Sequence, residues 1–321
     1  MARLRDDRFF GDAIDAAAAK SGLPPGLLEK DYWVSEVLRE LSILYRGEFL
    51  FKGGTSLSKA YGLIERFSED IDLLVLTNEN DHADAIDARL DRMWRTAAGV
   101  TGGTPVTERH VLGSFIDVQL PYPATKPRVG GLSENVRLEP GIAGGPLPRE
   151  VKTIRPMLAE HFPEAEGYSI EAYEDLTSFE LDVLHPARTL IEKLSAVNVI
   201  AEKLKLQDEA KRVVRSREAR HFYDIYYLLD PDKCSALDRL KEEGLSKIVE
   251  DCEEVNQRWY AGMKVRPEGG FGASVAFTDT SLAPALRRAY DKAVATLCFP
   301  TATPPTWDQV CARVVQHSES L

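Results

Sequence analysis

A short series of elements near residue 50 constrains this chain more than any other feature. Residues 48–52 are predicted to form a short strand, which Gly53-Gly54 ends. A helix is expected over about 55–64, opened by hydroxyl residues that are common helix caps. The next strand is predicted over 70–76 and carries two aspartates. This order of elements indicates a mixed α/β core: a strand, a glycine pair, a helix and then an acidic strand.

The two aspartates of the second strand are Asp70 and Asp72. Side chains two residues apart on a strand point to the same face, so these carboxylates are expected together, while Ile71 and Leu73 face a core. Neighbouring carboxylates repel unless cations neutralise them. Mg²⁺ is the expected cation, because it binds carboxylates together with substrate phosphates. The pattern predicts a catalytic metal site for phosphoryl chemistry.

The turn Gly53-Gly54-Thr55-Ser56 is the predicted phosphate-binding segment. Glycines let the backbone approach a phosphate closely because no Cβ intervenes. The helix that follows presents free N–H groups, and the two hydroxyls add donors. The turn is not a Walker A loop, since the chain contains no GxxxxGK[ST]. Neither the glycine pair nor Asp-x-Asp is specific alone, but their order favours nucleotide chemistry.

Helical periodicity dominates both ends of the chain, and the strands lie between them. Helices are predicted over 6–20, 28–41 and 82–98, and further strands near 104–110, 114–120, 135–140 and 178–183. Residues 141–148 and 263–284 are expected to be loops. From Pro186 onward the pattern is mainly helical. We therefore predict N-terminal helices and a core in residues 1–184, and a mainly helical domain in residues 185–321.

Composition excludes several classes of protein. The net charge of −11 argues against nonspecific coating of nucleic acid. Residues 193–220 are locally basic, with eight Lys and Arg against four acids, which alone indicates a solvated helical face. No apolar run reaches the roughly 20 residues of a membrane span, and we expect a cytoplasmic protein without membrane partners. Cysteine and histidine spacing does not predict a zinc site.

Several longer segments resemble a known family, the AbiEii/AbiGii nucleotidyltransferase toxins of the DNA polymerase β-like superfamily. The matching segments are Leu28–Val34, Phe51–Tyr61, Arg66–Leu73, Pro186–Ala196 and Arg220–Asp224. The resemblance covers about residues 25–230. It implies the superfamily fold, a mixed β-sheet core with an appended helical domain.

The resemblance also implies roles for residues around the turn. Asp70 and Asp72 would be metal ligands and catalytic residues, and the segment Gly53–Ser56 would hold the triphosphate. Lys59 and Arg66 flank the turn and would neutralise phosphate charge. Surface positions at helix ends are the alternative for both. Ser68 lies two residues before Asp70 and is included in the nucleotide site, where its phosphorylation would repel the substrate.

Three more site residues follow from the family pattern. Lys193 would face the cleft and balance the triphosphate, although a surface pair with a neighbouring acid is the alternative. Asp224 would act as a base or as a partner of the lysine. The third metal carboxylate is expected on a later strand, and Glu139 has the favoured alternation and chain order. Asp117 remains its competitor.

The predicted reaction is transfer of a nucleoside monophosphate from an NTP to a hydroxyl, with Mg²⁺. The resemblance makes RNA, at a tRNA 3′ end, the expected acceptor and a cognate antitoxin the expected partner. In that case the basic stretch 193–220 becomes a candidate RNA-facing surface. Two alternatives are a non-catalytic nucleotide-binding protein and a metal-dependent glycosyltransferase that uses Asp-x-Asp. The latter gives no reason for the Gly-Gly-Thr-Ser turn.

Overall fold

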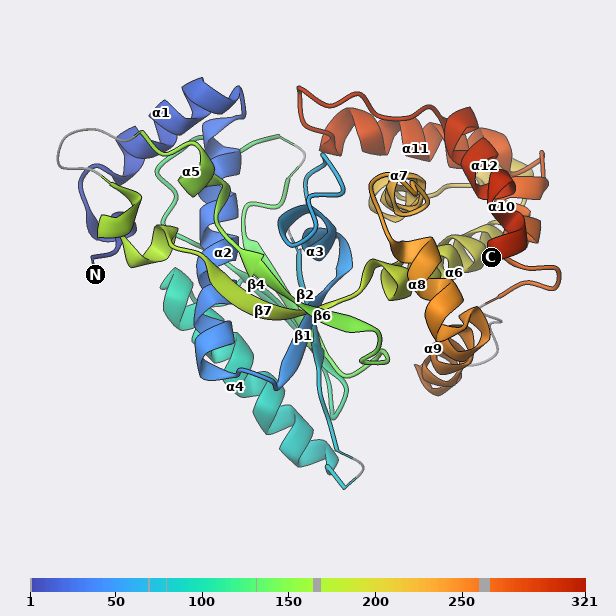
Figure 1. Cartoon of the computed structure of the whole chain (residues 1–321), viewed down its shortest axis with the longest axis horizontal. Coiled ribbons are helices and arrows are strands. Elements are labelled where there is room, and N and C mark those ends of the chain that lie inside the picture. Colours follow the sequence, from blue (N-terminus) through green and yellow to red (C-terminus); the bar gives the residue numbers. More distant parts are fainter. Residues whose placement is uncertain (1, 69, 79, 131, 164–168, 260–265) are drawn as a thin grey trace.

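A seven-stranded mixed sheet forms the centre of the protein (Figure 1). The computed structural model describes residues 2–68, 70–78, 80–130, 132–163, 169–259 and 266–321. Within them the strand order is β3-β4-β5-β2-β1-β7-β6. The strands are β1 (Phe49–Lys52), β2 (Asp70–Val75), β3 (Thr107–Val111), β4 (Phe115–Leu120), β5 (Val136–Gly141), β6 (Arg149–Ile154) and β7 (Phe179–Leu184). The central strand β2 pairs antiparallel with β1 and parallel with β5.

One face of the sheet is buried against the N-terminal helices α1 (Phe10–Ser21) and α2 (Pro25–Leu44) and against α4 (Ala83–Thr101). Ile71, Leu73 and Val75 of β2 point into this core. Strand residues alternate between faces, so Asp70 and Asp72 lie on the opposite face. The next residue on that face, Leu74, packs with Leu50 and Leu184. The predicted division of β2 into an apolar and an acidic face is confirmed.

The chain changes from strands to helices between β7 and α6. The remaining helices are α6 (Pro186–Lys205), α7 (Ser216–Leu228), α8 (Ala236–Glu243), α9 (Leu245–Trp259), α10 (Val275–Thr278), α11 (Ala283–Leu297) and α12 (Trp307–Gln316). They share a second core, which also takes in Leu57, Leu63 and Ile64 from the N-terminal half. Figure 1 shows this helical half on one side of the sheet and α1, α2 and α4 on the other. The division into two domains at residue 184 stays a prediction.

The segment before β2 joins the two halves through backbone hydrogen bonds. The amide of Phe67 donates to the carbonyl of Leu297 at 2.7 Å, and the amide of Phe299 donates to the carbonyl of Glu65 at 3.0 Å. The strand that carries the aspartates is therefore attached at its first end to the exit of α11.

The predicted fold class, a mixed α/β core with N-terminal helices and a helical C-terminal half, is confirmed. Three local predictions were wrong. The helix after the glycine pair, α3 (Gly53–Lys59), is shorter than expected, because the chain turns at Gly62 with φ +60°. Strand β6 was missed; it is an edge strand that pairs only with β7. The predicted loop 263–284, of which 263–265 lie outside the described residues, contains the short helix α10.

Short helix α5 (Met157–Glu160) completes the described helices of the N-terminal half. Across the part of the chain that the structure describes, no helix combines the length and apolar character needed to traverse a bilayer.

Candidate active site

Three acidic residues lie on one face of the neighbouring strands β2 and β5. Asp72 is the register partner of Glu139 on the neighbouring parallel strand, and their side chains share a hydrogen bond. Asp72 keeps partial contact with solvent, yet burial and the charge of Asp70 raise the pKa of its carboxyl. Burial and the charge of Asp72 likewise raise the pKa of Glu139 to about 8. The acids therefore form a repulsive cluster of the kind that a cation stabilises.

Asp117, the competitor for the third position, lies one strand further away. Arg137 of β5 holds its carboxylate through two hydrogen bonds of 2.9 and 2.7 Å. Nη2 of the same guanidinium, which donates one of these bonds, also lies 2.5 Å from Oε1 of Glu139. The geometry places Glu139, and not Asp117, beside Asp72.

Two arginines at the acids were not predicted as site residues. Arg220 of α7 donates to Asp70 at 3.1 Å, and Arg137 contacts Glu139. Although burial alone would lower it, the charges of Asp70 and Asp72 raise the pKa of Arg220. The sequence carried one signal for Arg137, which stands two residues before Glu139 on the same strand face. Arg220 is 150 positions from Asp70 in the sequence, so no local sequence pattern predicts the contact between them.

The donor chemistry of these residues fits a hard divalent cation, since Asp70, Asp72 and Glu139 supply carboxylates on adjacent strands. Within the described residues, however, no three His, Cys, Asp or Glu side chains are gathered closely enough to hold a metal ion. Arg220 and Arg137 contact two of the three carboxylates. Ion binding would therefore require Asp70 and Glu139 to release these arginines.

The glycine pair brings the acidic strand close to α3. Gly53 has φ +78°, and a Cβ added there would lie 2.0 Å from Oδ2 of Asp72. A Cβ on Gly54 would lie 2.7 Å from both Nη2 of Arg66 and Oγ of Ser68. The absent Cβ atoms thus make room for the side chains of the site itself.

The hydroxyls of the turn are engaged within the protein. Thr55 donates to the carbonyl of Asp70 at 2.5 Å and lies 2.9 Å from the hydroxyl of Ser68. Ser56 donates to the carbonyl of Gly53 at 2.9 Å. These bonds fix the turn against the first residue of β2. Phosphate binding by Gly53, Gly54, Thr55, Ser56 and Ser68 stays a prediction.

A buried ion cluster lies behind the turn. Arg66 donates to both oxygens of Asp224, each at 2.6 Å, and Nζ of Lys193 lies 2.7 Å from Oδ2 of the same carboxylate. Burial would raise the pKa of Asp224, but the charges of Arg66 and Lys193 hold it below its ordinary value. Burial lowers the pKa of Lys193 against the opposing effect of Asp224. Asp224 is thus a partner of the lysine, one of its two predicted roles.

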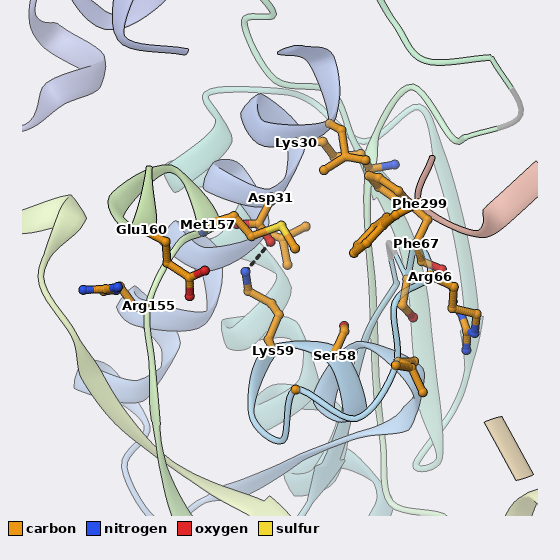
Figure 2. A pocket seen from close by; sticks show the side chains of 15 residues that line it. Lys30, Asp31, Ser58, Lys59, Arg66, Phe67, Arg155, Met157, Glu160 and Phe299 are labelled. Carbon is orange, nitrogen blue, oxygen red and sulfur yellow. Dashed lines mark hydrogen bonds and ion pairs between the residues drawn. The ribbon is translucent and has the colours of Figure 1, made fainter. Parts of the chain in front are cut away.

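Lys59 lies away from the acids. Its ammonium is paired with Asp31 of α2 at 2.5 Å, in a pocket of about 230 Å³ that Arg66, Phe67 and Ser68 also line (Figure 2). The side chain of Lys59 is only 4% exposed, so the predicted surface alternative is wrong. Its role in binding phosphate stays a prediction.

The profile of a known protein family matches most of this sequence. The family described as nucleotidyl transferase AbiEii toxin, type IV TA system, matches residues 37–313. The chain belongs to this family. Its AbiEii membership makes it a nucleotidyltransferase toxin of a toxin–antitoxin system, with a nucleotide substrate and an antitoxin partner. It also argues against the glycosyltransferase alternative.

Comparison with solved structures finds MenT4, a nucleotidyltransferase toxin from Mycobacterium tuberculosis H37Rv. The chain is 17% identical to it, with a TM-score of 0.48 over 95% of this chain and 94% of MenT4. Comparison with curated proteins finds no match.

Lys52 is a further residue near the acidic cluster that was not predicted from the sequence. It is the register partner of Asp72 on β1, and its charge counteracts the raised pKa of that carboxyl. Its ammonium donates to the carbonyl of Ala143 at 3.1 Å. Lys52 directly precedes Gly53, and this position beside the predicted turn was the sequence feature that indicated a place near the site.

Proposed function

We propose that this toxin transfers a nucleoside monophosphate from an NTP to a hydroxyl of RNA, at the 3′ end of a tRNA, using Mg²⁺. The observation that carries the proposal is the contact between Asp72 and Glu139, with Asp70 on the same face of the sheet. Nucleotidyltransferases generally use a divalent metal. Carboxylate oxygens are the ligands that Mg²⁺ prefers.

Asp70, Asp72 and Glu139 are the proposed metal ligands. A divalent ion bound there would activate the attacking hydroxyl and neutralise the leaving pyrophosphate. Ion binding would also offset the repulsion that raises the pKa of Asp72 and Glu139. Arg220 and Arg137 hold carboxylates of the cluster and would then be free to contact phosphate oxygens.

The triphosphate is proposed to lie along the turn from Gly53 to Ser56. The turn is fixed beside the acids by the bond from Thr55 to the Asp70 carbonyl. Lys52 supplies positive charge on the same face of the sheet as Asp72. Lys193 is held by Asp224, and this pairing keeps an ammonium near the predicted cleft.

The acceptor hydroxyl must lose its proton as it attacks the α-phosphorus, and pyrophosphate leaves on the opposite side. Asp70 is the proposed recipient of that proton at the mouth of the cluster. Asp70 is 7% exposed, and its carboxylate would become free to accept the proton once Arg220 contacts the phosphate oxygens. A positioned carboxylate acts as a general base when it lies within hydrogen-bond reach of the hydroxyl.

The proposal is tested by incubating the protein with each α-labelled NTP, Mg²⁺ and total RNA, beside Asp72→Asn. We expect label in a discrete RNA with the wild type, and its loss with the variant or after chelation of the metal. Label that enters RNA equally with the variant would refute the assignment of the acids. NTP binding without transfer to any acceptor would instead support the non-catalytic alternative.

A further inference from the structure

A cavity of about 440 Å³ lies between the sheet and helices α6, α7 and α9. This volume is in the range of small-molecule binding pockets. Lys52 at the end of β1 contributes to one wall, together with Ala143 and Gly144 after β5. Another wall is a single face of α6, formed by Glu192, Ser195, Ala196, Val199, Ile200 and Lys203.

The cavity is connected to the acidic cluster on two sides. Lys52, in its sheet wall, is the register partner of Asp72. His221, in its α7 wall, directly follows Arg220, which binds Asp70. A molecule in this cavity would therefore lie next to the carboxylates proposed for catalysis.

The lining fits an uncharged, partly apolar group. Ala196, Val199 and Ile200 supply apolar surface in the middle of the α6 face. Nδ1 of His221 is buried and has no hydrogen-bond partner among the residues that the structure describes. Burial and the nearby charges of Lys193 and Arg220 lower the pKa of this imidazole, so it is neutral near pH 7. Glu192 and Glu218 also line the cavity, beside Lys52 and Arg188. This mixed apolar and polar lining suits a nucleoside better than a phosphate, which the two carboxylates would repel.

Exposed cations continue beyond the cavity, from the end of α6 to the start of α7. Lys203 belongs to both the cavity wall and this surface. The further exposed cations are Lys205, Lys211, Arg215 and Arg217. Acids lie among them, and Lys211 is paired with Asp208 at 3.0 Å. Exposed cations that follow one another in the sequence from a residue of the cavity lining suit a polyanion with one end bound inside.

We propose that this cavity holds the terminal nucleoside of the RNA acceptor, and that the cations beyond it contact the preceding phosphates. The inference rests on the proposed function. The nucleoside of the NTP has the same chemistry and is the competing occupant. The acceptor is favoured because the five exposed cations from Lys203 to Arg217 outnumber the three phosphates of one nucleotide. A separate pocket, lined by Ser58, Lys59 and Ser68, lies beside α3.

The test distinguishes whether the cavity binds the terminal nucleoside of the RNA acceptor or the nucleoside of the NTP. Ala196→Trp fills the cavity without changing a charge, and Ala295→Trp on the exposed side of α11 is the matched control. The probes are a fluorescent RNA hairpin with an unpaired 3′ end, measured by anisotropy, and each NTP with Mg²⁺, measured by calorimetry. Thermal unfolding of both variants is recorded in parallel. A second variant, Lys203→Ala with Lys205→Ala, alters only exposed side chains and is compared with Lys292→Ala on α11.

We expect Ala196→Trp to weaken RNA binding about tenfold or more, as the loss of one stacked base would, while NTP binding changes less than about twofold. The double lysine variant should weaken RNA binding and reduce its dependence on salt by about two phosphate contacts. Weakened NTP binding with unchanged RNA binding would assign the cavity to the NTP. That result, or unchanged binding of both probes, would overturn the inference. Wild-type protein that labels a protein acceptor and binds no RNA would refute the RNA acceptor itself.

Discussion

The carboxyl groups of Asp72 and Glu139 lie side by side on neighbouring parallel strands and share a hydrogen bond. Two partly buried carboxyls in contact are unfavourable unless a proton or a cation lies between them. A pair of carboxyls in contact is therefore expected at a site that binds a cation. This relationship distinguishes Glu139 from the other acids of the sheet.

Glu139→Gln is expected to lower the rate of nucleotide transfer about 100-fold or more, because it removes a charge that the transition state needs. Incorporation of labelled NMP at saturating NTP and Mg²⁺ measures the effect. Asp117→Asn is the control on the adjacent strand. It removes a carboxylate that contacts Arg137 and should cost less than about tenfold. An equal loss in both variants would contradict the selection of Glu139.

Gly53→Ala is expected to lower stability and activity by more than the strain of a positive φ at a non-glycine residue would cause. Its Cβ would lie 2.0 Å from Oδ2 of Asp72, and the residue has φ +78°. Gly22→Ala is a matched control, since Gly22 has φ +73° and its Cβ would meet open space. The control should lose about 1 kcal/mol of unfolding free energy in urea. Gly53→Ala should lose more, together with most transfer activity. Equal losses of stability would show that the contact with Asp72 is unimportant.

Asp224→Asn is expected to lower the free energy of unfolding at pH 7 by about 3 kcal/mol, because Arg66 and Lys193 would be left buried without their counter-charge. The pKa of Asp224 is held below its ordinary value near 4, so its stabilisation is present above about pH 4 and is lost as the pH falls. Urea unfolding from pH 3 to pH 7 checks both points. The difference in unfolding free energy between wild type and variant should stay constant down to about pH 4 and become smaller below it. A difference that does not become smaller below about pH 4 would contradict the prediction.

The acidic face of β2 was predictable from the sequence because strand periodicity is local. Alternation alone puts Asp70 and Asp72 on one side, and Ile71 and Leu73 in the core. Glu139 was reached by its chain order and alternation, without a way to exclude Asp117. The register that decides between them is a tertiary property, set by the pairing of β5 with β2.

The long-range partners in the site were not predictable. Arg66 and Asp224 are 158 positions apart, and the sequence favoured phosphate as the partner of Arg66. Arg220 and Asp224 are one helical turn apart on α7, yet they bind different parts of the N-terminal half. Short-range sequence patterns indicate which charged residues belong to the site. They do not predict which oppositely charged residue each of them contacts.

His221 should make the protein less stable in mildly acidic solution. Burial and the charges of Lys193, Arg220 and Arg66 lower its pKa well below 6.5, while Asp224 opposes the shift. Below about pH 6.5 the unfolded chain binds a proton that the folded protein does not, so the free energy of unfolding falls by about 1.4 kcal/mol per pH unit. His221→Gln should remove this slope between pH 6.5 and 5 in urea unfolding, while His82→Gln, at an exposed position, should keep it. A slope that persists in His221→Gln would assign the acid sensitivity to another group.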